Sequence, residues 1–279
     1  MKKMVAGMNH SDLYELDYRS EGEKVQAYVE LPSKPGTYPL MVLCHGGLTV
    51  PGSYTHLNMG WPYDTLRLHT GKAIYLYPEY RGYNGSGGTV PGFLGVVHDI
   101  SNAITATESL KGFHVKGLYL YGVSLGGGAV LQLASERDDV KAVTADSPFV
   151  GFDATIRWFD RLGVHKTSPK ISKQSKMFLK LYGNKLTTAA YTTRSPIDHI
   201  STIHAPVLLL QGTDDNSVIW QSVQEYDQDM KKEHKTVKFV LVKGGQHALS
   251  DHDKTYDEAV SQTDTWFKKY GFPEVVFDQ

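Results

Sequence analysis

The stretch of sequence that most restricts the fold is LYLYGVSLGGG, which runs from Leu118 to Gly128. Its first part is a short apolar and aromatic run typical of a buried strand, and the pattern LGGGAVLQLAS that follows indicates a helix. Gly122 and Gly126 flank Ser124 at this change from strand to helix. Glycine suits such a tight turn, because neighbouring backbone comes too close to leave room for a Cβ atom. The pattern predicts an α/β protein in which Ser124 either is held exposed at the tip of the turn or only caps the helix.

Apolar runs and helical patterns alternate along the rest of the chain. The apolar runs, continuous as in strands covered on both faces, are 40–44, 73–77, 118–121, 142–145 and 207–210, with 237–242 mostly apolar. The helical patterns are 62–69, 95–111, 125–136, 218–232 and 254–270. This order predicts a mostly parallel, doubly wound α/β sheet. Near the N-terminus, residues 13–18 and 24–30 alternate around a Ser-Glu-Gly turn, which predicts an antiparallel hairpin.

Residues 148–196 interrupt this alternation, because they contain two helical patterns and no convincing strand. The patterns are FDATIRWFDRLG and ISKQSKMFLKLYG, and each ends with a glycine in the position of a C-cap. A helical insertion between two strands most simply packs over the carboxyl edge of the sheet, where open α/β sheets bind ligands. We therefore expect a single domain over residues 1–279, in which 148–196 form a small helical lid.

The aromatic residues of the expected lid lie at helical spacings. Such spacing is typical of packing residues, but it also suits the lining of an acyl or aromatic pocket. The candidate substrate-binding residues are Trp158, Phe159, Phe178 and Tyr182.

The composition excludes several classes of partner. With 29 basic and 30 acidic residues the formal net charge is −1, so the chain lacks the overall positive charge of proteins that bind nucleic acid or anionic lipid. Polar and acidic residues interrupt the N-terminus before an apolar core of secretory length can form, and no later window approaches a membrane span. Cys44 is the single cysteine and cannot form an intramolecular disulfide, which fits a reducing compartment. We expect a cytoplasmic protein that binds neither nucleic acid nor membrane. The sequence leaves open whether it forms a homodimer.

A serine at such a turn needs further groups before it can act as a nucleophile. Its hydroxyl is weakly nucleophilic near neutral pH, so Ser124 predicts a histidine base and an orienting carboxylate, in the chain order Ser, Asp, His. The strand run 206–211 continues into GTDDNSV, which places Asp214 and Asp215 at its carboxyl end. The next strand run ends in GGQHA, a flexible loop that brings His247 to the same edge. Singly, an Asp-Asp pair is usually an N-cap and a histidine is usually structural, but together these groups follow the required order.

Acyl transfer also needs hydrogen-bond donors for the oxyanion that develops on the carbonyl oxygen. One donor is expected to be the backbone N–H of Leu125, the residue after the nucleophile. The second is expected from LCHGGL, the glycine-rich loop after the strand run 40–44, and we favour the Gly47 amide. The alternative is that this loop is only a strand-ending turn, and His45 is expected to be structural rather than catalytic.

Together these motifs resemble those of the α/β-hydrolases, over nearly the whole chain. More narrowly, PEYRGYNGSG at 78–87 is similar to the arginine-glycine segment of the prolyl oligopeptidase-like and dienelactone hydrolase-like branches. YTTRSP at 191–196, which leads into HISTIHAPVLLLQGTDD, resembles the run that precedes the acid-bearing strand in those branches.

The resemblance implies a role for each residue of the triad. Ser124 would be the nucleophile and His247 the base, while the family spacing Gly-x2-Asp-x2-Val fits Asp215 as the acid and leaves Asp214 off register. The chain departs from both branches: it has no room for the large propeller of prolyl oligopeptidases, and dienelactone hydrolases use a cysteine in place of Ser124. The substrate therefore does not follow from the fold.

Other acidic residues are also candidates for a function. Asp146 in ADSPF follows a strand run, and some hydrolases take their acid from that position, so Asp146 is the alternative to Asp215. Asp99 is expected near the start of a helix, where an aspartate stabilises the helix dipole. The sequence DHD at 251–253 is too short a segment to close a coordination sphere, and no spaced partners are visible. We expect no metal and no cofactor.

Three classes of function follow from these residues. A carboxylesterase for small or medium acyl or aryl esters is favoured, because a short lid leaves a pocket for small ligands and no peptide-anchoring domain is evident. It would act by two-step acyl transfer through an acyl-enzyme on Ser124. A small serine peptidase or aminoacyl hydrolase is the second class, and it would use the same residues. The third is a hydrolase fold that binds a ligand with little turnover.

Overall fold

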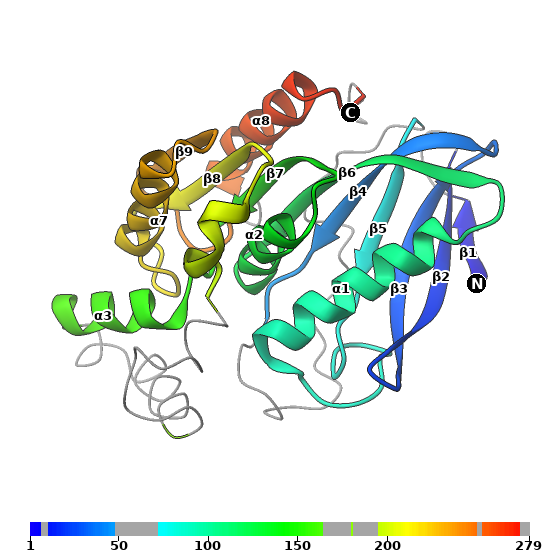
Figure 1. The fold of residues 1–279 in the computed structure, drawn as a ribbon, viewed down its shortest axis with the longest axis horizontal. Coiled ribbons are helices and arrows are strands. Elements are labelled where there is room, and N and C mark those ends of the chain that lie inside the picture. The colour runs from blue at the N-terminus through cyan, green and yellow to red at the C-terminus, as the bar shows by residue number, and fades with distance from the viewer. Residues whose placement is uncertain (7–10, 48–71, 164–179, 181–194, 250–252, 274–279) are drawn as a thin grey trace.

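The computed structural model describes residues 1–6, 11–47, 72–163, 180, 195–249 and 253–273 (Figure 1). At its centre is a nine-stranded sheet with the order β1-β2-β3-β5-β4-β6-β7-β8-β9. The strands are β1 (Lys2–Ala6), β2 (Ser11–Ser20), β3 (Glu23–Pro32), β4 (Gly36–Cys44), β5 (Ile74–Pro78), β6 (Phe113–Val123), β7 (Val140–Asp146), β8 (Val207–Gly212) and β9 (Val237–Val242). Strands β4 to β9 run parallel, while β1, β2 and β3 form an antiparallel end of the sheet.

The register of the parallel strands brings their carboxyl ends to one edge. Cys44 at the end of β4 pairs with Gly122 of β6, and Val123 of β6 pairs with Asp146 at the end of β7. Strands β8 and β9 end together, because Gly212 pairs with Val242. The loops that follow β4, β6, β7, β8 and β9 therefore leave the sheet side by side, at the edge where open α/β sheets bind ligands.

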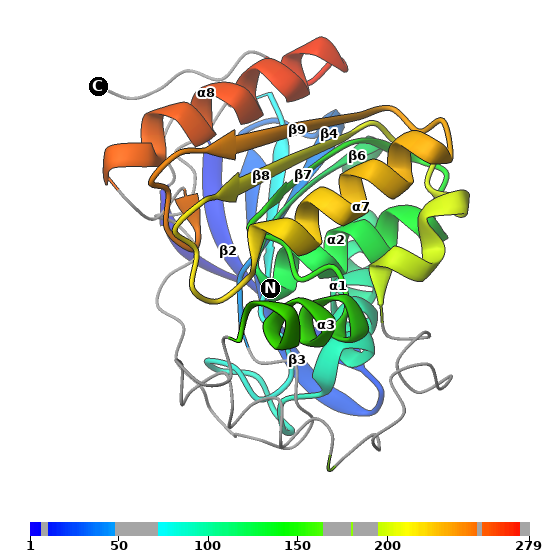
Figure 2. The same cartoon turned by 90° about the vertical axis from the view of Figure 1, so that its left-hand side faces the viewer.

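Helices cover both faces of this sheet (Figures 1 and 2). Helices α1 (Gly92–Glu108), α2 (Leu125–Glu136) and α7 (Trp220–Lys232) lie along one face, and α8 (Asp253–Lys269) covers the other. Helix α3 (Phe152–Leu162) packs beside α7, and the 3-10 helix η2 (Pro196–Thr202) packs against α2 and α7. Among the described helices, none combines the length and the apolarity that crossing a membrane would need.

The core is divided by the sheet into two hydrophobic clusters, as the period-two alternation of a strand requires. Along β6, Leu118 and Leu120 belong to the cluster beneath α1, α2 and α7. Tyr119 and Tyr121 belong to the cluster beneath α8. Each such buried apolar side chain stabilises the fold by about 1.5–3 kcal/mol. The apolar runs of the sequence lack polar alternation because both of their faces are covered.

These elements confirm the predicted mostly parallel α/β fold with an antiparallel hairpin at its N-terminal end. Strand β1 was not predicted, because its short segment KKMVA begins with two lysines and gives no apolar run. The helical pattern at 62–69 lies outside the described residues. Of the expected lid at 148–196, the structure describes α3 and the start of η2, whereas the second helical pattern lies outside the described residues apart from Lys180. The lid stays a prediction.

Candidate active site

Ser124 stands at the turn between β6 and α2 with φ 56° and ψ −115°. A positive φ is uncommon in a residue other than glycine and costs about 1–3 kcal/mol, so surrounding contacts must enforce it. Two backbone hydrogen bonds do so: Ser124 N–H donates to Asp146 O, and Phe149 N–H donates to Ser124 O, each at 2.9 Å. The Ser124 side chain is partly exposed and makes no capping hydrogen bond to α2, which contradicts the capping alternative.

The glycines around Ser124 allow β4, β6 and α2 to approach one another closely. A Cβ atom at Gly122 would lie 2.3 Å from the carbonyl oxygen of Gly126. A Cβ atom at Gly126 would lie 2.3 Å from the carbonyl oxygen of Cys44 and 2.5 Å from that of His45. Side-chain carbons do not approach backbone oxygens so closely, so both positions need glycine, as predicted. The start of α2 is thereby held against the loop after β4.

The loop after β4 runs beside Ser124. A Cβ atom at Gly46 would lie 3.3 Å from Ser124 Cβ and 3.8 Å from its Oγ. Leu125 is the first residue of α2, so its backbone N–H has no acceptor within the helix. Backbone amides of the helix N-terminus and of the adjacent loop suit an oxyanion that forms next to Ser124. The donor roles of Leu125 and Gly47 stay predictions.

Aromatic side chains support this loop. The rings of His45 and Tyr80 stack with centroids 4.0 Å apart, and the Tyr80 hydroxyl donates to the His45 carbonyl oxygen at 2.9 Å. Tyr83 packs on Gly47, where a Cβ atom would lie 2.4 Å from the tyrosine hydroxyl oxygen. His45 Nε2 lies 3.5 Å from the buried Glu79 carboxylate. The structure thus places His45 in the packing that supports the loop.

Asp215 and His247 come together from the loops that follow β8 and β9. His247 Nδ1 lies 2.8 Å from Asp215 Oδ2. The Asp215 side chain is fully buried, whereas that of His247 is 26% exposed. A buried carboxylate on Nδ1 favours the tautomer that carries its proton there, which leaves Nε2 to accept a proton.

Further hydrogen bonds orient the Asp215 carboxylate. Its Oδ1 atom accepts from the backbone N–H groups of Ser217 and Val218, both at 2.8 Å. Its Oδ2 atom also accepts from Gln211 Nε2 at 2.8 Å. Gln211 is fully buried at the end of β8, and its role was not predicted from the sequence. The sequence feature that could have identified Gln211 is that it is a single polar residue at the end of an apolar strand run.

Asp146, the alternative acid, lies between Ser124 and the loop that carries His247. Its Oδ1 atom accepts from the Ser147 hydroxyl at 3.0 Å and from the Leu249 backbone N–H at 3.2 Å. Asp215 is the carboxylate that the structure places on His247 Nδ1.

Trp158 is the candidate substrate-binding residue whose side chain the structure describes. It lies on α3, and its Nε1–H group donates to Glu225 Oε2 on α7 at 2.8 Å. The Arg161 guanidinium lies over the Trp158 ring, 5.0 Å from its centroid. The side chain of Phe159 and the whole of Phe178 and Tyr182 lie outside the described residues. Substrate binding by all four stays a prediction.

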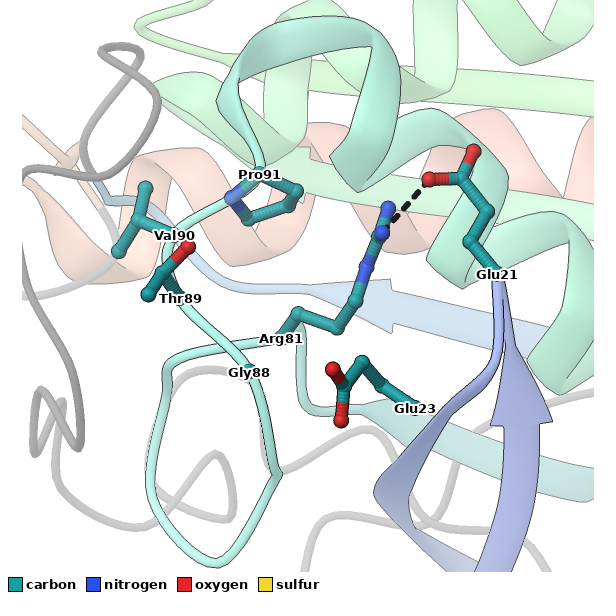
Figure 3. Close-up of a pocket in the computed structure, with 7 residues that line it drawn as sticks. All are labelled: Glu21, Glu23, Arg81, Gly88, Thr89, Val90 and Pro91. Atoms are coloured by element: carbon teal, nitrogen blue, oxygen red, sulfur yellow. Dashed lines mark hydrogen bonds and ion pairs between the residues drawn. The ribbon is translucent and has the colours of Figure 1, made fainter.

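A cavity of about 260 Å³ lies beside Arg81, near the turn between β2 and β3 (Figure 3). Arg81 donates to Asp99 at 2.9 Å, to Glu21 at 2.6 Å and to the Gly95 carbonyl oxygen at 3.3 Å. Because these donors are already bound, Arg81 is no free receptor for an anionic ligand. The helix-dipole role predicted for Asp99 is wrong, because α1 begins well before it at Gly92 and Asp99 is fully buried against Arg81.

Cys44 lies at the end of β4, directly before the loop beside Ser124. It is 2% exposed, and burial raises the pKa of its thiol, so it does not supply a thiolate nucleophile near neutral pH. Among the residues that the structure describes, no three His, Cys, Asp or Glu side chains group as a metal site. The Asp251-His252 pair of the DHD sequence lies outside them.

The sheet order and the strand–turn–helix around Ser124 define the α/β-hydrolase fold, and solved structures share it. The Pyrococcus furiosus esterase Pf2001 has a TM-score of 0.67 and 15% sequence identity, with 92% of this chain and 90% of the esterase covered. The Pyrococcus horikoshii acylaminoacyl peptidase has a TM-score of 0.71 and 17% identity, with 97% of this chain covered. This chain spans 44% of that peptidase.

The sequence then places the chain within one family of such enzymes. The model of the prolyl oligopeptidase family matches residues 94–271, so the chain belongs to that family and is a serine hydrolase of the prolyl oligopeptidase type. A Bacillus subtilis (strain 168) protein named as the uncharacterized peptidase YtmA is 26% identical over 233 residues, which are 82% of this chain and 83% of YtmA. The resemblance to the prolyl oligopeptidase-like branch is confirmed.

Proposed function

We propose that this protein is a carboxylesterase that cleaves esters of small to medium acyl or aryl groups. The observation that carries the proposal is the 2.8 Å contact between His247 Nδ1 and Asp215 Oδ2, at the sheet edge where Ser124 stands. A histidine held in this way can take a proton through Nε2, which is the role that a serine nucleophile requires of its base.

In the proposed reaction, Ser124 Oγ attacks the ester carbonyl while His247 Nε2 takes the hydroxyl proton. The resulting oxyanion accepts hydrogen bonds from the amides of Leu125 and Gly47, and Asp215 stabilises the imidazolium. The imidazolium returns the proton to the alcohol as the C–O bond breaks. Water then attacks the acyl-enzyme by the same route and releases the carboxylic acid.

An esterase stands among the proteins that share this fold, which supports an ester substrate. The alignment with esterase Pf2001 covers 92% of this chain and 90% of the esterase. We further propose that Trp158 on α3, in the expected lid, offers an aromatic surface to an acyl or aryl group.

The variant Ser124→Ala tests the proposal. We expect kcat/KM for p-nitrophenyl acetate to fall by about 10⁴- to 10⁶-fold, because the nucleophile and the base act as a unit. A fluorophosphonate should label the wild type once, at Ser124, when the adduct is mapped by peptide mass. Ser101→Ala on the surface of α1 is the matched control and should keep both properties. A folded wild type that takes no label, or a Ser124→Ala variant that keeps more than about a tenth of the activity, would refute the nucleophile.

A small serine peptidase is the second candidate, and membership of the prolyl oligopeptidase family favours it. Aminoacyl p-nitroanilides and p-nitrophenyl esters with matched acyl groups separate the two activities. Anilide turnover within about tenfold of ester turnover would indicate a peptidase, because amides demand stronger transition-state stabilisation. A folded protein with neither label nor turnover would instead be a ligand-binding hydrolase fold.

A further inference from the structure

The end of β7 and the turn after it contact Ser124 and the segments that carry the other two residues of the proposed triad. Ser124 N–H donates to the Asp146 carbonyl oxygen, and Phe149 N–H donates to the Ser124 carbonyl oxygen, each at 2.9 Å. Ser147 N–H donates to the Leu210 carbonyl oxygen of β8, the strand that leads to Asp215, at 2.8 Å. This turn is therefore hydrogen-bonded to the proposed nucleophile on one side and to β8, the strand before Asp215, on the other.

The same turn holds the loop of the proposed base through two side chains. Ala248 N–H donates to Ser147 Oγ at 3.1 Å, and Leu249 N–H donates to Asp146 Oδ1 at 3.2 Å. The Ser147 hydroxyl donates in turn to Asp146 Oδ1 at 3.0 Å. Asp146 and Ser147 have no exposed surface, so these bonds are made away from water, where losing one is costly.

The backbone at this contact is strained on both sides. Ser147 has φ 47° and Ala248 has φ 59°, although neither is glycine. Residues in this left-handed region persist only where other contacts enforce them, and they cluster at functional sites. The two strained residues are joined directly, through the Ala248 N–H and the Ser147 hydroxyl.

We propose that Asp146 and Ser147 are positioning residues that set the distance between Ser124 and His247. The inference rests on the proposed function. Asp215 holds the His247 ring through Nδ1, whereas the place of the ring relative to Ser124 also depends on the backbone of the loop that carries it. The bonds from Asp146 and Ser147 fix the backbone directly after His247, and Asp146 also accepts from the backbone of Ser124.

A carboxylate is suited to this role, because it can accept several hydrogen bonds at once. Besides Ser147 and Leu249, the Tyr121 hydroxyl lies 3.4 Å from Asp146 Oδ2. Asp146→Ala keeps the backbone bond to Ser124 but removes the acceptor of the Leu249 N–H and of the Ser147 hydroxyl. An asparagine keeps one acceptor oxygen and loses the charge.

Asp146→Ala, Asp146→Asn and Ser147→Gly separate positioning from folding. With p-nitrophenyl acetate we expect kcat of Asp146→Ala to fall about 100-fold, with KM changed less than about threefold, because small displacements of a catalytic group cost that much. Asp146→Asn should recover at least about tenfold of the loss, since it can still accept from Leu249 N–H. Ser147→Gly relieves the strained φ, so it provides a folded variant if Asp146→Ala does not fold, and its kcat should fall about tenfold.

Thr144→Val is the matched control, because Thr144 is also buried on β7 but its hydroxyl has no hydrogen-bond partner among the described residues. Its kcat should stay within about twofold of wild type. Hydrogen exchange at the Ala248 and Leu249 amides gives a second readout that needs no activity, and it should accelerate in Asp146→Ala and not in Thr144→Val.

The outcomes distinguish the inference from the function on which it rests. Wild-type kcat in folded Asp146→Ala and Ser147→Gly, or equal losses in Thr144→Val, would overturn the positioning role. Unchanged exchange at both amides would overturn the anchoring contact itself. A wild type without turnover would refute the proposed esterase, and amide exchange would then still decide whether Asp146 anchors the loop.

Discussion

At the scale of single residues, Gly126 connects the turn around Ser124 to the loop after β4. A Cβ atom there would lie 2.3 Å from the carbonyl oxygen of Cys44, which belongs to the backbone and cannot rotate away. Any larger residue must therefore push α2 away from β4. That movement would also displace the Leu125 amide relative to the loop of Gly47, so packing and the proposed oxyanion site depend on the same glycine.

Gly126→Ala should accordingly lower both stability and turnover. We expect a loss of about 1–3 kcal/mol in the free energy of unfolding, which is typical of overpacked cores, and a fall in kcat of at least about tenfold. Urea unfolding and p-nitrophenyl acetate kinetics measure the two effects. Gly22→Ala is the control: nothing lies within 4 Å of its Cβ position, so its φ of 89° should cost stability without changing kcat.

At the scale of elements, the sequence predicted the strands and helices that have a clear period. The run 237–242 matches β9, and the pattern 218–232 lies within two residues of α7. The ends of elements were predicted less well where apolar and polar residues mix. Strand β6 begins at Phe113, earlier than the predicted run at 118, because its first residues alternate between half-buried and exposed. Such a segment has the burial pattern of a strand at the edge of a sheet, although it pairs with β4.

The contact between α3 and α7 is a feature of this scale that no local pattern predicts. Glu225 of α7 accepts from Trp158 Nε1 at 2.8 Å and from Arg157 at 3.0 Å. These residues are far apart in the sequence, and each alone resembles an ordinary surface position. These hydrogen bonds join α7 to α3, the first helix of the expected lid. They therefore help to fix the position of Trp158.

A double-mutant cycle tests this link. Glu225→Ala and Trp158→Phe should each destabilise the protein, and their coupling energy in urea unfolding should be about 0.5–1.5 kcal/mol, the net value of a partly exposed hydrogen bond. Glu233→Ala, at the exposed end of α7, replaces Glu225→Ala in the control cycle and should show no coupling to Trp158. Additive effects in the first cycle would mean that the contact does not hold α3.

At the scale of the whole molecule, parallel topology explains why the proposed site could be predicted in outline. Ser124, Asp215 and His247 each follow a predicted strand, and the carboxyl ends of parallel strands share one edge. The supporting residues Gln211 and Ser147 were missed, because their roles arise from contacts between loops that only the folded chain brings together. The order of strands in the sequence is enough to predict the three residues of the triad. The residues that support them depend on tertiary packing, which the sequence alone does not reveal.

The whole fold also forms a junction between the antiparallel end of the sheet and its parallel part. Glu21, in the turn between β2 and β3, accepts from Arg81 after β5 at 2.6 Å and contacts His98 of α1 at 2.5 Å. The hydrogen bonds from His98 and Arg81 lower the pKa of Glu21. These contacts connect three elements that are distant in sequence.

The lowered pKa of Glu21 predicts a pH dependence of stability. A carboxylate whose pKa is lower in the folded state adds stability above its unfolded pKa, about 4.3, and loses it as pH falls through the lower folded value. Glu21→Gln should therefore be less stable than wild type at pH 7, and the difference should vanish in acid. Because the Glu21 side chain is 47% exposed, we expect less than about 1 kcal/mol at pH 7.

Urea unfolding at pH 7, 5, 4 and 3 measures this dependence, with Glu23→Gln as the control on the same turn. Glu23 is exposed, and the described residues include no ion-pair partner for it, so its variant should follow the wild-type curve at every pH. A Glu21→Gln curve that coincides with that of Glu23→Gln would show that the contacts with Arg81 and His98 add no stability. A difference that stays constant from pH 7 to pH 3 would assign the effect to packing of the side chain, because the contribution of the charge must shrink as the carboxylate is protonated.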